Sequence, residues 1–166
     1  MKKTLVSIIL ALVLVFSCAV AENSPSLEKT IVGKLTSVNG ANLEGVSIIL
    51  STIEPETPEE AAFLKASKER FEGIELSDEA VMDEFHKLTV SGYTPECGDI
   101  LAAFRYATEY EADTKLTAIV GIIKGEATEW TALKANVGED GVEVYFTQAI
   151  LEAASTNHAV MALVRG

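Results

Sequence analysis

Residues 116–146, LTAIVGIIKGEATEWTALKANVGEDGVEVYF, decide the fold class of this chain. The run from Leu116 to Ile123 is apolar and rich in β-branched residues, which is typical of a buried strand. Trp130 to Val137 and Val142 to Phe146 alternate apolar with polar residues, the period of a strand that buries one face. Short glycine-containing turns separate the three segments, and strands this close in sequence usually pair antiparallel. The stretch therefore predicts an antiparallel β unit.

The segments on either side of this stretch extend the unit. Asp99 to Tyr110 fits a helix by one set of apolar residues and a strand by another. We predict the strand, because a turn precedes it and the next strands follow without the crossover length that parallel pairing needs. A helix here would instead give an α+β layer. Thr147 to Ser155 is predicted as a short helical turn capped by Thr147, and Ala159 to Val164 as a closing strand.

The N-terminal part of the chain predicts a hairpin and a helix. Two β-branched segments, Thr30 to Val38 and Val46 to Thr52, flank the turn signal Asn39-Gly40. A helix then begins with Thr57 as N-cap, Pro58 at the first position and Glu60 in a capping box, and it ends before Gly73. The acidic residues around its first turn favour the helix dipole.

A second, shorter helix is predicted to begin at Ser77. Its apolar stripe would be Val81, Met82 and Phe85. Together these elements predict one α+β domain, mostly β, over residues 30–166, with the hairpin and two helices in 30–86 and a β-rich unit in 87–166. The β-rich unit is expected to be an antiparallel, sandwich-like (Ig-like) structure.

The first 21 residues predict an export signal. Lys2 and Lys3 form a positive start, Leu5 to Phe16 is an apolar run too short to span a bilayer comfortably, and Ala19-Val20-Ala21 is a small-residue cleavage site. Cleavage after Ala21 would release a soluble protein with a flexible leader over residues 22–29. The alternative is lipidation at Cys18, which would tether the protein to a membrane. Either way the protein is expected to be secreted or associated with the cell envelope.

The net charge limits the kinds of partner that the protein can bind, and the cysteine count limits its disulfide bonds. The chain carries a net charge of −12, and loss of Lys2 and Lys3 with the signal lowers it by two more, to −14. A surface this acidic repels phosphate backbones, so nucleic acid is excluded as a partner. After cleavage at Ala21 only Cys97 remains, so no intramolecular disulfide forms, and Cys97 is expected to be a small packed apolar residue.

Three segments carry a family resemblance: Phe85-His86-Lys87-Leu88-Thr89-Val90-Ser91-Gly92-Tyr93, Trp130-Thr131-Ala132-Leu133 and Gly141-Val142-Glu143-Val144-Tyr145-Phe146-Thr147. Together they resemble small exported proteins of unknown function from anaerobic Gram-positive bacteria, over the C-terminal half of the chain. The resemblance implies a sandwich-like fold and no catalytic activity.

No catalytic motif is present in the sequence. There is no Gly-x-Ser-x-Gly elbow, no glycine-rich phosphate loop and no His-Glu-x-x-His pair. His86 and His158 are the only histidines. We expect His158 to lie in an exposed turn and His86 to be partly packed, and nothing in the sequence brings either one to Cys97. The sequence therefore assigns no catalytic, cofactor-binding or metal-binding residue.

Two weaker binding hypotheses follow from residue spacing. Glu109, Glu111 and Asp113 alternate, so on an extended segment their carboxylates would project from one side and could bind Ca²⁺. Aromatic residues on strands could line a glycan-binding face, although such residues are more often core. The candidates for that face are Tyr93, Tyr106, Trp130 and Tyr145.

The function expected from these observations is an extracytoplasmic, non-enzymatic module that binds a protein or a glycan. Export, the β-rich pattern and the lack of a catalytic motif support it. One alternative is a secreted or envelope hydrolase without a recognisable motif, which requires a concave site that gathers Cys97, His86 or the acidic residues. Another alternative is an envelope structural or inhibitor-like protein, which would show a tight protein partner.

Overall fold

The computed structural model describes residues 30–166. At its centre are three antiparallel strands, β6 (Leu116–Lys124), β7 (Ala127–Gly138) and β8 (Gly141–Phe146). Their connections are tight: Lys124 pairs with Ala127, and Gly138 pairs with Gly141. The predicted antiparallel unit is therefore confirmed.

Six further strands and two helices surround these three, with one short 3₁₀ turn. The strands are β1 (Ile31–Val32), β2 (Lys34–Ser37), β3 (Ser47–Ser51), β4 (Val81–Ser91), β5 (Ile100–Phe104) and β9 (His158–Arg165). The helices are α2 (Pro58–Glu69) and α3 (Gln148–Thr156), and the 3₁₀ turn is η1 (Pro95–Cys97). The strand favoured for Asp99 to Tyr110 is confirmed over Ile100–Phe104.

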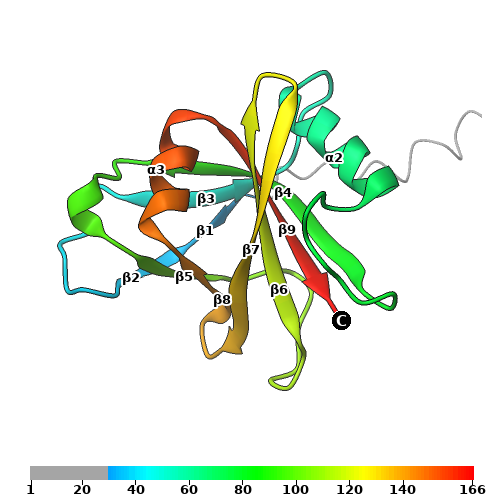
Figure 1. The fold of residues 1–166 in the computed structure, drawn as a ribbon. Coiled ribbons are helices and arrows are strands. Elements are labelled where there is room, and N and C mark those ends of the chain that lie inside the picture. The colour runs from blue at the N-terminus through cyan, green and yellow to red at the C-terminus, as the bar shows by residue number, and fades with distance from the viewer. Residues whose placement is uncertain (1–29) are drawn as a thin grey trace, which may run out of the picture.

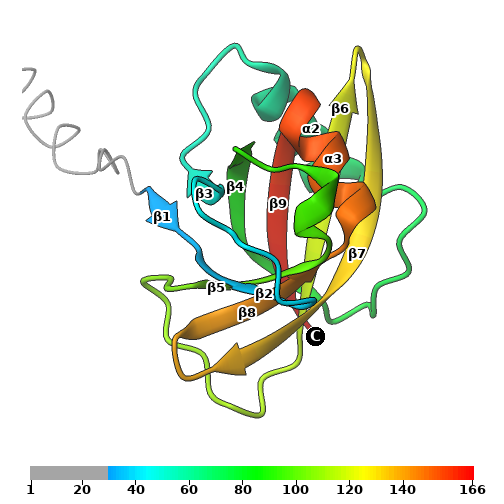
Figure 2. The same ribbon diagram turned by 90° about the vertical axis from the view of Figure 1, so that its left-hand side faces the viewer.

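All nine strands belong to one antiparallel sheet with the order β1-β3-β4-β9-β6-β7-β8-β5-β2. The two ends of this order, β1 and β2, are neighbours in the chain and are separated only by Gly33. A single bent segment thus pairs with β3 on one side and with β5 on the other, so it connects the two edges of the sheet. The sheet is therefore barrel-like, and its curl is visible in Figures 1 and 2.

The expected Ig-like sandwich is wrong, because the sheet closes into a barrel-like form. A sandwich needs two separate sheets, whereas here every strand has neighbours in one continuous hydrogen-bonded order. The bend depends on Gly33, because a Cβ at this position would lie 3.0 Å from the Phe104 ring and 3.2 Å from the carbonyl oxygen of Ile48. The predicted hairpin is confirmed only in part: β1 pairs with β3 over two residues before the chain turns away to β5.

The barrel-like sheet buries residues on both of its faces near α2. Alternate residues of β9, Ala159, Met161 and Leu163, belong to the interior cluster, whereas Val160, Ala162 and Val164 lie in the outer clusters packed with α2. Figure 1 shows α2 and α3 on opposite sides of β4, β9 and β6. Helix α3 packs Leu151 and Ala154 onto the interior cluster. No helix of residues 30–166 is long and apolar enough to cross a membrane.

The predicted second helix is wrong, because its residues begin strand β4. The register of β4 against β9 shifts between Met82 and Glu84, which is a β-bulge. The bulge places Met82 and Phe85, three residues apart, in the same outer cluster under α2. A bulged strand thus produced the three-residue spacing that resembles one face of a helix.

The two helices have different N-terminal caps. In α2, as predicted, the backbone N–H of Glu60 donates to Thr57 Oγ1 over 3.3 Å, and Glu60 Oε2 accepts from the backbone N–H of Glu56. Helix α3 follows Thr147, as predicted, but the Thr147 side chain makes no capping bond. Instead Asp99 Oδ1 accepts from the backbone N–H of Gln148 at 2.8 Å, a cap supplied from the start of β5.

Candidate functional site

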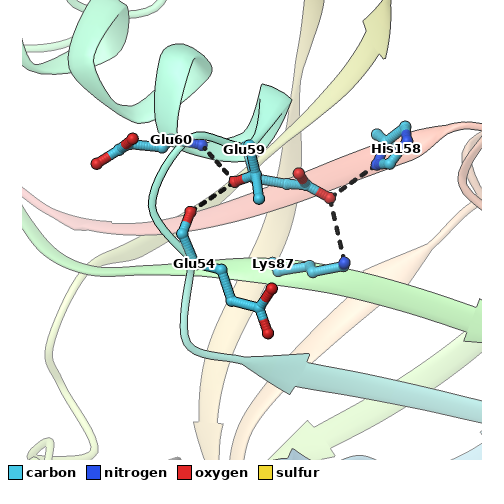
Figure 3. Close-up of polar contacts among 6 residues, drawn as sticks. Glu54, Glu59, Glu60, Lys87 and His158 are labelled. Atoms are coloured by element: carbon cyan, nitrogen blue, oxygen red, sulfur yellow. Dashed lines mark hydrogen bonds and ion pairs between the residues drawn. The ribbon is translucent and has the colours of Figure 1, made fainter. Parts of the chain in front are cut away.

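A buried carboxylate at the start of α2 organises the most developed polar site. Glu59 is 1 % exposed and lies in the first turn of the helix, which is fixed there by the Thr57 cap and Pro58. Its Oε1 atom lies 2.9 Å from Nδ1 of His158 and 3.4 Å from Nζ of Lys87 (Figure 3). His158 is the first residue of β9 and Lys87 lies on the neighbouring strand β4, so three separate elements meet at this oxygen.

The Glu59 carboxylate is ionised at neutral pH. Burial acts to raise the pKa of Glu59, but the hydrogen bonds from His158 and from the backbone N–H of Glu59, together with the positive charge of Lys87, outweigh it and hold the pKa below the ordinary value of 4.5. An ionised carboxylate only accepts hydrogen bonds, so Nδ1 of His158 carries the hydrogen. In neutral His158 the other ring nitrogen, Nε2, is then an acceptor, on a side chain that is 59 % exposed.

The site opens into a cleft of about 510 Å³, which we call the α2 cleft. Its lining comes from β4, the β6–β7 turn, the end of α3 and the start of β9, together with Glu59. The lining residues are Glu59, Lys87, Leu88, Thr89, Val90, Ile123, Lys124, Gly125, Ala154, Ser155, Thr156, Asn157, His158 and Ala159. In a chain with a net charge of −12, this lining carries two lysines and a single carboxylate.

Replacing Glu59 with glutamine should remove an acid-sensitive part of the stability. The lowered pKa means that Glu59 stabilises the fold above its unfolded pKa, and that this contribution is lost as the pH falls through the folded value. We expect Glu59→Gln to lose about 1–3 kcal/mol at neutral pH, and the gap to the wild type to close below about pH 4. Urea unfolding at several pH values measures this.

Glu69→Gln is the matched control, because Glu69 is exposed near the end of the same helix. It should change stability by less than about 0.5 kcal/mol at any pH. Parallel loss of stability in the wild type and Glu59→Gln between neutral pH and pH 3 would contradict the role given to Glu59.

A second polar group extends from the barrel interior, at His86 and Tyr106, to the exposed Thr108. We call it the barrel-end cluster, and its members are Glu84, His86, Tyr106, Thr108 and Tyr110. Nε2 of His86 lies 3.0 Å from Glu84 Oε2, and Thr108 Oγ1 donates to Glu84 Oε1 over 3.2 Å. The ring of Tyr106 lies 5.9 Å from that of His86 and 6.4 Å from that of Tyr110. His86 and Tyr106 are each 9 % exposed, so the partial packing expected for His86 is in fact burial.

Alkaline titration should separate the two tyrosines of this cluster from Tyr93 and Tyr145, whose pKa values are also raised, Tyr93 mainly by burial and Tyr145 mainly by its bond to Asp99. Burial, with the nearby acidic side chains, raises the pKa of Tyr110 to about 12, and burial raises the pKa of Tyr106 further. Because the folded state keeps these protons when the unfolded state releases them, stability should fall as the pH rises above 10. We expect phenolate absorbance to show these two tyrosines titrating last, with Tyr110→Phe removing one of them. Ionisation of all four tyrosines in one step near pH 10 would contradict their burial.

The four aromatic residues proposed for a glycan face lie in three different places. Tyr93 and Tyr145 reach the same segment, with Tyr93 donating to the carbonyl of Gly98 and Tyr145 to the Asp99 carboxylate. Trp130 packs on the outer face against Phe71, with ring centroids 4.9 Å apart. Tyr106 lies inside the barrel. The structure therefore does not bring these four side chains onto one surface.

The structure also shows where Cys97 and the residues proposed for calcium binding lie. Cys97 is a buried free cysteine whose Sγ lies 3.6 Å from Thr94 Oγ1, and no described hydrogen bond joins it to either histidine. Glu109, Glu111 and Asp113 are exposed in the segment between β5 and β6. Within residues 30–166, no three His, Cys, Asp or Glu residues are grouped to hold a metal ion. The cleavage and lipidation candidates, Ala21 and Cys18, lie outside the described residues.

The sequence did not predict the contact of Glu59 with Lys87 and His158. Glu59 and His158 are 99 residues apart, and a helix-dipole role already accounted for Glu59. No local spacing signals a contact that depends on how α2 lies across β4 and β9. Compared with known proteins, the chain matches no protein-family model, no curated protein and no solved structure.

Proposed function

We propose that this protein is an exported, non-enzymatic binding module that recognises an extracytoplasmic protein or glycan through the α2 cleft. The observation that carries the proposal is the shared contact of Lys87 and His158 with the buried Glu59 carboxylate. No cofactor is part of the proposal, and calcium at Glu109, Glu111 and Asp113 stays a prediction of the sequence.

The cleft suits recognition because its polar groups are held in place before a ligand arrives. Glu59 is fixed by burial in α2, so the Lys87 and His158 side chains that it anchors lose less rotational freedom on binding. Both remain open to a ligand, with 40 % and 59 % of their side chains exposed. Ser155, Thr156 and Asn157 line one wall, where their side chains donate to carbonyls of α3 and keep their oxygen atoms as acceptors. Hydroxyl and carboxylate groups of a glycan or peptide match this lining.

Binding of the mature protein to a glycan array and to an extract of cell-surface proteins tests the proposal. We expect Lys87→Met and His158→Gln each to weaken the strongest binding by about tenfold, the value of one hydrogen bond of about 1.4 kcal/mol. Lys134→Met is the matched control, because Lys134 is exposed on β7 and lies outside the cleft. Equal binding by the wild type, the cleft variants and the control would contradict the proposal. A tight protein partner that tolerates these variants would favour the structural or inhibitor-like alternative.

One observation favours an enzyme as the second candidate. A carboxylate that holds Nδ1 of a histidine leaves Nε2 as a base, the arrangement of a carboxylate–histidine pair in hydrolases. The pair consists of Glu59 and His158, whereas the sequence suggested Cys97, His86 or the acidic residues as components. A screen of chromogenic esters and glycosides tests it, and turnover that falls by about 100-fold or more in His158→Gln would support an enzyme over a binding module.

Export remains part of the proposal. The intact mass of the protein recovered outside the cytoplasm distinguishes the two processing routes predicted for residues 1–21. Cleavage after Ala21 gives a chain that begins at Glu22, and lipidation gives a chain that begins at an acylated Cys18. Recovery of the uncut chain from the cytoplasm would contradict export.

A further inference from the structure

The charged side chains of the α2 cleft balance one another before a ligand binds. The charged groups that line the cleft with His158 are Glu59 on α2, Lys87 on β4 and Lys124 on β6. Lys87 Nζ lies 3.4 Å from the Glu59 carboxylate, and Lys124 Nζ lies 2.8 Å from that of Glu129 on β7. These two ion pairs leave no net charge when the His158 ring is neutral. An anionic ligand would then add one uncompensated negative charge to a chain that already carries −12.

His158 is the group that can balance such a ligand. Its Nδ1 atom already donates to Glu59 Oε1 at 2.9 Å, so a proton taken from solvent goes to Nε2. The imidazolium then lies between the Glu59 carboxylate and the open cleft. Lys87 contacts the same Oε1 atom, so Figure 3 shows Lys87 and His158 side by side around one oxygen. A single ligand group in the cleft is therefore within reach of both side chains.

We infer that the α2 cleft binds a carboxylate of its ligand between Lys87 and His158, and that His158 takes up one proton from solvent as the carboxylate binds. The inference rests on the proposed function and names the chemical group that the ligand presents there. The two oxygens of a carboxylate match Nζ of Lys87 and the protonated Nε2 of His158. One added proton balances one negative charge, so a phosphate group, with a charge of about −1.5 to −2, fits less well.

The lining favours a peptide as the source of this carboxylate. None of the described residues that line the cleft is aromatic, so the cleft offers no flat ring face to a sugar. Its apolar part is aliphatic and includes Leu88, Ile123 and Ala154. Because the chain as a whole is acidic, we expect neutral or basic residues beside the carboxylate in the peptide. The carboxylate belongs either to an Asp or Glu side chain or to the end of the peptide chain.

NMR titration of the isotope-labelled mature protein with small probes tests the inference. N-acetylglutamic acid α-amide presents a side-chain carboxylate, and N-acetylalanine presents a chain-end carboxylate. N-acetylglutamine α-amide is the neutral control. We expect one of the two acids to shift the signals of Lys87 and residues 155–159, and to bind at least about tenfold more tightly than the neutral control. The acid that binds more tightly identifies the source of the carboxylate.

The pH dependence of this binding measures the proton uptake. Histidine changes its charge between pH 5 and 8, whereas carboxylates and lysines ordinarily keep theirs from pH 6 to 8. Uptake of one proton can change the affinity by at most tenfold per pH unit. We expect the affinity for the acid to rise about tenfold from pH 8 to pH 6. At pH 7.5, saturation with the acid should move the His158 ring signals to their protonated positions.

Three variants separate the two parts of the inference. His158→Gln should weaken binding of the acid about tenfold at pH 6 and remove its pH dependence. Lys87→Met should weaken binding about tenfold but keep the pH dependence. Lys134→Met, outside the cleft, should match the wild type in both.

Four results would overturn the inference: equal affinity for the acids and the neutral control, an affinity that does not depend on pH, tighter binding of inorganic phosphate or glucuronate than of either acid, or no shift in the cleft with any probe. Failure of the proposed function has a different signature, because the natural partner would then bind the wild type and the cleft variants equally. A partner that is weakened by Lys87→Met and His158→Gln without any pH dependence would refute the inference and keep the proposed function.

Discussion

Replacing Gly141 with alanine is expected to cost about 3–5 kcal/mol of unfolding free energy, since overpacking and backbone strain each contribute about 1–3 kcal/mol. Gly141 begins β8 with a φ of 124°, a conformation that residues with a side chain rarely adopt. A Cβ there would lie 2.3 Å from the carbonyl oxygen of Phe104 on the neighbouring strand β5. Both obstacles are backbone, so neither is relieved by a side-chain rotation.

Urea unfolding followed by Trp130 fluorescence measures this loss. Gly125→Ala is the matched control, because Gly125 also has a positive φ, 63°, but a Cβ there meets no atom within 4 Å. It should cost about 1 kcal/mol, the conformational part alone. Similar losses for the two variants would show that β5 and β8 are not in the close contact described.

Replacing Phe104 with alanine is the second change with a large expected effect, about 3–5 kcal/mol. Phe104 is fully buried inside the barrel and packs its ring against Phe146 and Tyr106, at centroid distances of 6.2 and 6.5 Å. It also fills the space beside Gly33, where the bent segment connects the two edges of the sheet. The loss of this ring therefore leaves a cavity where β1, β2 and β5 meet.

The comparison variant is Phe63→Ala on α2. Phe63 is half-buried on the outer face and packs edge-on against Phe85 at 5.1 Å. Its loss should cost about 1–2 kcal/mol, because partial burial removes less apolar area from water. The difference between the two variants in urea unfolding tests whether the barrel interior, rather than the layer under α2, is the main core. A larger loss for Phe63→Ala would contradict this.

The strands predicted best are those whose partners are close in sequence. Residues 116–146 pair through tight turns, so alternation and turn residues specify both the strands and their neighbours. The strand nature of Ile100–Phe104 and the start of α2 at its Thr57 cap were also predictable. In each case the deciding interactions lie within a few residues of the chain.

The closure of the sheet was not predictable from the same signals. It requires β2 to leave the hairpin and pair with β5, which begins 63 residues after β2 ends, and only Gly33 hints at the bend. The failed helix at Ser77 has a similar cause, since the bulge at Met82 and Glu84 exists only in the pairing of β4 with β9. Residue spacing reports which side chains share a face, and a bulged strand and a helix can give the same spacing.

The candidate sites depend even more on distant contacts. His158 was expected in an exposed turn, and it is indeed more than half exposed, but its bond to Glu59 depends on α2 crossing the outer face of β9. Tyr106 was proposed for an exposed glycan face and lies instead beside His86 inside the barrel. The sequence suggested binding through polar and aromatic side chains. The side chains that the fold brings into contact are not the ones that the sequence placed together.

We propose that this protein binds its partner in the α2 cleft, which Glu59 organises. Amide chemical-shift mapping with the strongest-binding glycan or peptide from the array and extract tests it most directly. We expect the largest shifts at Glu59, at Lys87 and over residues 155–159, and we expect Glu59→Gln to abolish them while the protein stays folded. Shifts confined to residues outside the cleft, or unchanged binding by folded Glu59→Gln, would contradict the claim.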